Sequence, residues 1–256
     1  MESGLQRITV GVGSARREIA VRQRPGASPG LVWLGGFKSD MISTKATALA
    51  AWAEPRHIPY LRFDYSGHGQ SSGAFEDFTI GDWLAEAAAC FDRLTDGPQI
   101  VIGSSMGGWI ALLLARLLAQ NGQSDRLRAL VLIAPAWDMT EELMWTRFSA
   151  EARGAIERDG VYHRPSDYGE PYAITRALIE EGRSHLIGGT GFDPGCPVRI
   201  IQGLRDPDVP WQHALRLVEL LGGEDVRLTL IKDAEHRLSR EQDLALLFAA
   251  IGEFTG

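Results

Sequence analysis

Short apolar runs rich in β-branched residues alternate along this chain with amphipathic stretches of helical length, and this alternation limits the possible folds. The runs expected to be strands are compact, and most lack strict polar alternation: Leu31–Leu34, Tyr60–Phe63, Ile100–Ile102, Ala129–Ile133, Val198–Ile201 and Val226–Ile231. Helices are expected between and after them: Thr44–Ala53, Thr79–Leu94, Gly107–Ala119, Trp211–Leu221 and Arg240–Phe254. Two earlier segments, Arg7–Val12 and Glu18–Arg22, alternate in period two like an antiparallel edge hairpin. The sequence therefore predicts an α/β fold with a mostly parallel, eight-stranded sheet and helices on both faces.

One long segment interrupts this rhythm. Residues 137 to about 190 separate two expected strands and are polar, aromatic and rich in helix formers. A connection of this length is too long for a plain loop, so we expect a small helical cap inserted into the domain. Neither an internal repeat nor a flexible linker divides the 256 residues, which favours a single domain over residues 1–256.

Composition excludes several classes of function. The 33 acidic and 26 basic residues give a net charge of −7, which is unsuited to binding nucleic acid or anionic lipid. Cys90 and Cys196 are 106 positions apart, so neither a CxxC site nor a disulfide framework is expected. The sequence holds no HExxH motif and no Gly-Lys-Ser or Gly-Lys-Thr, and Gly11-Val12-Gly13 lacks the third glycine of a dinucleotide-binding loop. We therefore expect no metal and no cofactor.

The distribution of apolar residues along the sequence indicates where the protein is located. The first residues, Met1–Arg7, form no apolar signal-peptide core, and no apolar run approaches the ~18 residues that span a bilayer. We expect a cytoplasmic protein without a membrane span. The oligomeric state is not encoded in any of these features.

The strongest chemical signal is a Gly-x-Ser-x-Gly motif with Ser105 at its centre, within Gly103–Gly108. The expected strand Ile100–Ile102 precedes the motif, and the apolar helix Gly107–Ala119 follows it. So sharp a strand-to-helix turn forces a strained backbone on its central residue and lifts the side chain above the sheet. Ser105 is therefore the candidate nucleophile.

A serine hydroxyl needs a base, and the base needs an acid that orients it. Of the histidines after Ser105, only His236 lies on a short loop between the last expected strand and the last helix. His163 and His185 fall in the expected cap, and His213 lies early in a helix that should face solvent. His236 is the candidate base.

The acid should follow the preceding strand, where two aspartates are available. Asp206 stands three residues after Gly203, directly beyond the strand, and is the favoured acid. Asp208 is the alternative, although its place before Val209-Pro210 suits it better to cap the following helix.

Two backbone N–H groups are expected to form an oxyanion hole. Met106, directly after the candidate nucleophile, supplies one, and the loop Gly35–Asp40 supplies the other, with Phe37 best placed. A further turn, Phe63–Ser71, holds Asp64, which can accept hydrogen bonds from backbone amides, and His68, for which we expect a structural role because it precedes Ser105.

The sequence resembles the α/β-hydrolase superfamily in three features: the sharp strand-to-helix turn at Ser105, an aspartate beyond a later strand, Asp206, and a histidine on the last loop, His236. Within it, these segments look like the mitochondrial palmitoyl-protein thioesterases, also described as mycophenolic acid acyl-glucuronide esterases: Phe63–Ser71, Asp96–Gln99, Gly103–Trp109, Gly203–Trp211 and His236-Arg237. The resemblance runs from about residue 30 to the C-terminus and implies a Ser105, Asp206, His236 triad acting on acyl thioesters and activated esters. The strong Arg bias, 23 Arg against 3 Lys, suggests a bacterial relative.

The predicted function is a serine hydrolase that cleaves a small-molecule carboxylic ester or acyl thioester through an acyl-enzyme. An acyltransferase or a cofactor-free perhydrolase with the same triad is the alternative among enzymes. A ligand-binding protein that kept the fold without catalysis is the alternative from another class, because a fold alone does not prove an activity.

Overall fold

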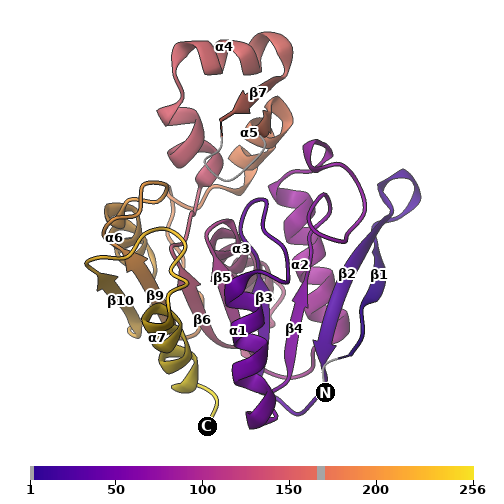
Figure 1. The fold of residues 1–256 in the computed structure, drawn as a ribbon, viewed down its shortest axis with the longest axis vertical. Helices are drawn as coiled ribbons and strands as arrows, with labels where there is room; N and C mark the ends of the chain where they lie inside the picture. Colours follow the sequence, from indigo (N-terminus) through magenta and orange to yellow (C-terminus); the bar gives the residue numbers. More distant parts are fainter. Residues whose placement is uncertain (1–2, 166–170) are drawn as a thin grey trace.

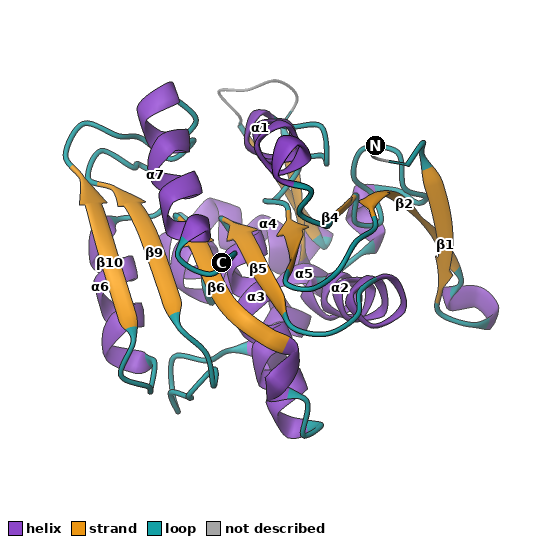
Figure 2. Ribbon diagram, turned by 90° about the horizontal axis from the view of Figure 1, so that it is seen from below, coloured by secondary structure: helices purple, strands orange, loops and turns teal. Residues whose placement is uncertain are grey.

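The computed structural model describes residues 3–165 and 171–256 and has one large sheet at its centre (Figures 1 and 2). The strands follow this spatial order: β1 (Gln6–Val10), β2 (Arg17–Arg24), β4 (Tyr60–Phe63), β3 (Gly30–Leu34), β5 (Gln99–Ser104), β6 (Leu127–Ile133), β9 (Val198–Gly203) and β10 (Val226–Ile231). The pairs β1–β2 and β2–β4 are antiparallel, and the other pairs are parallel. The predicted mostly parallel, eight-stranded sheet is confirmed.

Helices cover both faces of this sheet, as Figure 2 shows. Helices α1 (Thr44–Ala53) and α7 (Glu241–Gly252) cover one face, and α2 (Ile80–Leu94), α3 (Met106–Gln120) and α6 (Trp211–Leu220) cover the other. Side chains of one strand alternate between the two cores, so that Leu31 and Trp33 face α1 while Val32 and Leu34 face α3. All of β3 and β5 is buried, which explains why their sequences are apolar except at the two ends of β5, Gln99 and Ser104.

The segment between β6 and β9, residues 137–190, lies above the carboxyl ends of the strands (Figure 1). It contains a π-helical turn (Met139–Met144), a 3-10 turn (Trp145–Arg147) and the helices α4 (Ala150–Asp159) and α5 (Arg176–Gly182). It also contains an antiparallel pair, β7 (Val161–Arg164) and β8 (Tyr172–Thr175), which the sequence did not predict. Neither strand carries the fully buried apolar run that marks the central strands of the large sheet. Residues 166–170 of this segment lie outside the described residues.

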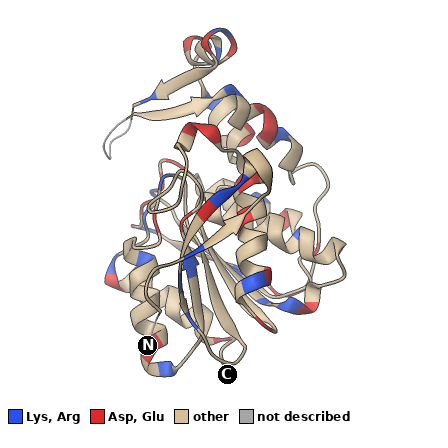
Figure 3. Ribbon diagram, turned by 90° about the vertical axis from the view of Figure 1, so that its right-hand side faces the viewer, with Lys and Arg blue, Asp and Glu red and all other residues tan. Residues whose placement is uncertain are grey.

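Charges of both signs are interspersed along the elements seen in Figure 3. Arg199 of β9, for example, bonds both Asp225 and Glu253, at 2.9 and 2.8 Å. Among the described residues, no helix has both the length and the apolar character needed to cross a membrane.

Candidate active site

Ser105 stands at the sharp turn between β5 and α3. Its φ of 55° lies in the left-handed region, which residues with side chains rarely adopt. Three hydrogen bonds fix this backbone. Ser105 N–H donates to the carbonyl of Ile133 at 2.9 Å, and the carbonyl of Ser105 accepts from the N–H groups of Gly108 and Ala136, at 2.8 and 3.1 Å. The neighbouring elements therefore hold the strained conformation and keep the half-buried side chain accessible.

Two glycines let the strand and the helix approach each other at this turn. A Cβ added to Gly103 would lie 2.3 Å from the carbonyl oxygen of Gly107, and one added to Gly107 would lie 2.0 Å from that of Leu34. Neither space accepts a side chain. The glycines of the motif are thus required by the close packing of β3, β5 and α3.

The structure brings Ser105, His236 and Asp206 together. Nε2 of His236 lies 3.0 Å from Oγ of Ser105, and Nδ1 of His236 lies 2.7 Å from Oδ2 of Asp206. An ionised Asp206 accepts from Nδ1–H, which leaves Nε2 to accept the hydroxyl proton of Ser105. The three side chains come from the ends of β5, β9 and β10, so the parallel sheet itself sets their positions.

The side chain of Asp206 is fully buried, and hydrogen bonds hold both of its oxygens. Oδ1 accepts from the backbone N–H groups of Asp208 and Val209, at 2.9 and 2.8 Å. Oδ2 accepts from Nε2 of Gln202 at 3.1 Å, in addition to its contact with His236. Sequence reasoning missed Gln202, although a buried amide at the end of an apolar strand is a usable signal for a supporting residue.

Two expectations near this loop were wrong. Asp208 does not cap α6, because the helix begins after Pro210, and no side-chain capping bond is made at its N-terminus. His213 does not face solvent: it is 3% exposed and stacks on Trp137, with ring centroids 4.3 Å apart. Trp137 lies at the start of the inserted segment and covers this face of α6, a contact across 76 positions that local periodicity does not reveal.

The other two histidines lie within the inserted segment. His163 is exposed on β7. His185 contacts Glu181, with Nε2 2.6 Å from Oε1, one helical turn away. Neither histidine has a described hydrogen bond with Ser105 or Asp206.

The loop after β3 runs directly beside Ser105. A Cβ added to Gly36 would lie 3.4 Å from the Cβ of Ser105. Among the described residues, the N–H of Phe37 donates to no partner. Met106 is the first residue of α3, where helix N–H groups have no intrahelical acceptor. Both predicted oxyanion donors are therefore available next to the serine.

His68 supports this loop rather than the serine, as the sequence suggested. Its Nε2 accepts the backbone N–H of Lys38 at 3.1 Å, and its Nδ1 lies 3.0 Å from the carbonyl of Ser66, which fixes the tautomer. Burial lowers the pKa of His68 to about 4, so the ring is neutral near pH 7. Asp64 accepts from the backbone N–H groups of Met41 and Gln70, at 2.6 and 2.8 Å, as expected.

Aromatic rings line the approach to the loop. The ring of Phe37 packs edge-on against Phe75, at 4.8 Å between centroids, and against Tyr172 of β8, at 6.1 Å. The ammonium of Lys38 lies over the ring of Phe75, at 4.6 Å. The inserted segment thus contributes Tyr172 to the group of aromatic rings around Phe37.

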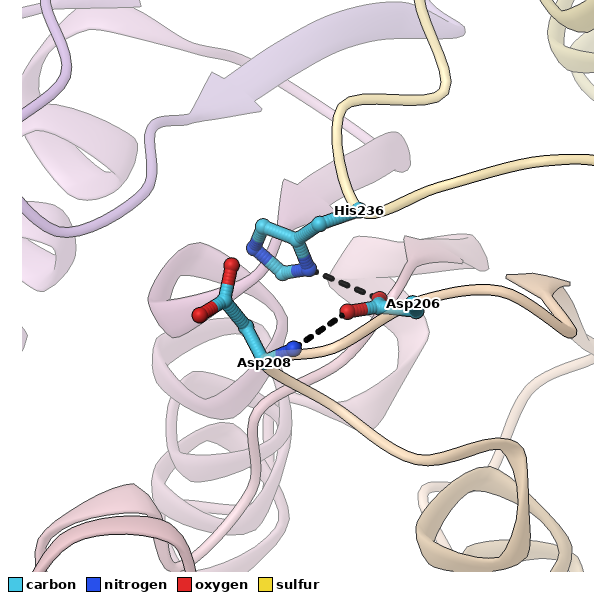
Figure 4. A group of neighbouring side chains, drawn as sticks. All are labelled: Asp206, Asp208 and His236. Carbon is cyan, nitrogen blue, oxygen red and sulfur yellow. Dashed lines mark hydrogen bonds and ion pairs between the residues drawn. The ribbon is translucent and has the colours of Figure 1, made fainter. Parts of the chain in front are cut away.

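Within the described chain, one group of side chains has the spacing of metal ligands: Asp206, Asp208 and His236, whose ligand atoms lie within 4.8 Å of one another (Figure 4). Nδ1 of His236 and both oxygens of Asp206 are already engaged in hydrogen bonds. A metal would have to displace these bonds, so the donor set does not fit a resident ion.

Comparison with known proteins identifies the class. The family described as the alpha/beta hydrolase fold matches residues 47–185, and the chain belongs to this family. It is 34% identical to the mitochondrial palmitoyl-protein thioesterase ABHD10 of Bos taurus, over 92% of this chain and 76% of that protein. A putative hydrolase from Agrobacterium vitis S4 is 44% identical, with a TM-score of 0.95 over 99% of each chain. The mouse alpha/beta hydrolase domain-containing protein 10 is 29% identical, with a TM-score of 0.86 over 98% of each chain. These findings confirm the predicted resemblance and support a hydrolytic activity.

Proposed function

We propose that this protein is a serine hydrolase that cleaves carboxylic esters or acyl thioesters, with Ser105 as nucleophile, His236 as base and Asp206 as acid. The observation that carries the proposal is the continuous pair of contacts from Oγ of Ser105 through His236 to Asp206, at 3.0 and 2.7 Å. Such a pair of contacts is the geometry required to activate a serine hydroxyl.

The reaction proceeds in two halves. His236 Nε2 takes the proton of Ser105 as Oγ attacks the acyl carbon, and the carbonyl electrons move onto oxygen. The N–H groups of Phe37 and Met106 bind this oxyanion, at roughly 3 kcal/mol for each donor. Collapse re-forms the carbonyl and expels the alcohol or thiol, which takes the proton from Nε2. Water then gives a proton to His236 and attacks the acyl-enzyme, and the second collapse releases the acid and returns the proton to Ser105.

The inserted segment would act as a cap over the acyl group within a single domain. Its Tyr172 packs on Phe37, and Phe37 also contacts Phe75 and Trp83, so an apolar acyl chain would meet aromatic rings beside the oxyanion hole. The relatives named as palmitoyl-protein thioesterases support an acyl thioester as one substrate class. The cytoplasmic location and the exclusion of nucleic acid as a partner stay predictions.

A fluorophosphonate probe tests the nucleophile directly. The wild-type protein should be labelled, Ser105→Ala should lose the label, and Ser104→Ala, the neighbouring serine in β5, should keep it. Labelling that persists in Ser105→Ala would refute the assignment. A chain-length series of p-nitrophenyl esters beside matching acyl-CoA thioesters would then define the acyl preference.

The acid is tested by Asp206→Asn. The substitution keeps the shape of the side chain but reverses the tautomer of His236, so turnover should fall by roughly 10⁴-fold. Steady-state kinetics on a p-nitrophenyl ester measure the loss. Turnover near that of the wild type would reject Asp206 as the acid.

A further inference from the structure

One carboxylate beside the proposed catalytic residues has no part in the reaction above. An oxygen of Asp208 lies within 4.8 Å of a ring nitrogen of His236 and of a carboxylate oxygen of Asp206. Figure 4 shows the two aspartates on opposite sides of the imidazole: Asp206 is joined to Nδ1, and the carboxylate of Asp208 lies beside the edge that carries Nε2.

This carboxylate has no partner among the residues that the structure describes, whereas both oxygens of the neighbouring Asp206 are hydrogen-bonded. The N–H groups of Asp208 and Val209, the nearest backbone donors, are both taken by Asp206. Arg147 of the inserted segment donates to the backbone carbonyl of Asp208, at 3.1 Å, and not to its carboxylate. Because Asp208 is partly buried, an unpaired charge there is costly unless an incoming molecule complements it.

The mechanism identifies which part of the substrate meets this charge. In the proposed function, on which this step rests, Nε2 of His236 gives its proton to the departing oxygen or sulfur. The leaving group must therefore come within hydrogen-bond distance of Nε2, and Figure 4 places the carboxylate of Asp208 at that edge of the ring. The acyl group lies on the other side of the scissile bond from this leaving group.

We propose that Asp208 selects substrates by the charge of their leaving group. Esters and thioesters whose alcohol or thiol carries a cation near the scissile bond are favoured, and those that carry a phosphate or carboxylate there are disfavoured. The preference should be roughly three- to twenty-fold for each unit charge, as Coulomb's law gives for charges about 6 Å apart at an effective dielectric constant between about 30 and 80.

Asp208→Asn isolates this charge. The substitution keeps the size of the side chain, and the bond that fixes the loop runs from the backbone N–H of residue 208 to Asp206, at 2.9 Å, so the loop does not depend on the carboxylate. Asp125→Asn removes the same charge from an exposed position before β6, at the opposite edge of the sheet, and serves as the matched control.

The experiment compares kcat/KM for butyrylcholine and for its uncharged isostere, 3,3-dimethylbutyl butyrate. The wild type and Asp125→Asn should prefer the choline ester by the same factor, and Asp208→Asn should bring the ratio close to one. Any effect of the lost charge on His236 acts on both esters alike and cancels in this ratio. In the wild type the ratio should also fall as ionic strength rises, because salt screens a partly exposed charge. That measurement tests the proposal without any variant.

A ratio that stays unchanged in Asp208→Asn, or a wild type with no preference, overturns the role of Asp208 while the hydrolase assignment stands, provided that the neutral ester is hydrolysed. A wild type that hydrolyses neither ester and is not labelled at Ser105 overturns the proposed function, and the charge selection with it.

Discussion

Replacing His68 tests whether a residue remote from the reaction positions the oxyanion hole. Lys38, which follows Phe37, donates its backbone N–H to His68 at 3.1 Å. Lys38 has a φ of 55°, so its backbone is held in a conformation that it would leave without this bond. In His68→Leu the acceptor is lost, and the loop that carries the N–H of Phe37 should relax away from Ser105.

The expected magnitude has two parts. The N–H of Lys38 lies in a partly buried bond, so leaving it unpaired should lower the free energy of unfolding by about 1 kcal/mol. A displacement of the oxyanion donor by about 1 Å lowers kcat by roughly 10²-fold, whereas KM should change little because the ground-state carbonyl depends less on that donor. His68→Gln offers an amide oxygen near the position of Nε2 and should recover most of kcat.

The assay is steady-state hydrolysis of a p-nitrophenyl ester by the wild type and both variants, beside denaturant unfolding at pH 7. His57→Asn is the control, because His57 is exposed just before β4, at the edge of the sheet away from the site, and Asn tolerates its positive φ of 57°. If His68→Leu keeps the kcat of the wild type, or if Leu and Gln lower kcat equally, His68 does not position the loop.

The difference in unfolding free energy between the wild type and His68→Gln should depend on pH. Burial lowers the pKa of His68 to about 4, whereas an unfolded histidine titrates near 6.5. Between pH 6.5 and 4, His68 therefore binds a proton in the unfolded state but not in the folded state. The free energy of unfolding is at its full value above pH 6.5 and falls by up to about 3 kcal/mol as the pH drops to 4. His68→Gln lacks this loss. A constant difference in unfolding free energy between the wild type and His68→Gln from pH 7 to 4.5 would contradict a buried neutral ring.

Two further substitutions, the first with a control, test the packing of α3 against β3 and the hydrogen bonds that hold Asp206. Gly107→Ala should destabilise the fold by more than about 3 kcal/mol or prevent folding, because the new Cβ would lie 2.0 Å from the carbonyl oxygen of Leu34. Gly154→Ala, in open space within α4, should unfold at the same or a higher denaturant concentration, and equal behaviour of the two variants would refute the packing argument. Gln202→Met removes the 3.1 Å bond to Asp206 and should lower kcat by roughly ten-fold. An unchanged kcat in that variant would show that the backbone N–H groups alone hold the acid.

Much of the fold could be predicted because its signals are local. The bounds expected for Tyr60–Phe63 match β4, which is buried throughout. Those expected for Val226–Ile231 match β10, a partly exposed edge strand in which apolar and polar residues largely alternate. The candidate site followed from topology: in a parallel sheet, residues just beyond neighbouring strands meet at one edge. Chain order alone was therefore enough to place Asp206 and His236 beside Ser105.

The features that escaped prediction depend on contacts between distant segments. His213 is buried because Trp137 covers it, and the hydrophobic pattern of the α6 sequence gives no sign of this contact. The strands β7 and β8 are short and stabilise each other, so neither has a strong signal alone. His68 could be excluded as a base, but its bond to Lys38 joins two loops whose proximity only the folded sheet determines.

Of the two aspartates on one loop, position beyond the strand favoured Asp206 as the acid, and the backbone geometry gives the physical reason. Asp206 and Asp208 have the same chemistry and lie two positions apart, so composition cannot separate their roles. The turn directs the N–H groups of residues 208 and 209 toward Asp206, which becomes buried and fully bonded. The same N–H groups therefore cannot bond the carboxylate of Asp208, which lies beside His236. In the proposed mechanism, the backbone of this turn therefore determines both which aspartate orients the histidine and which one is left to meet the substrate.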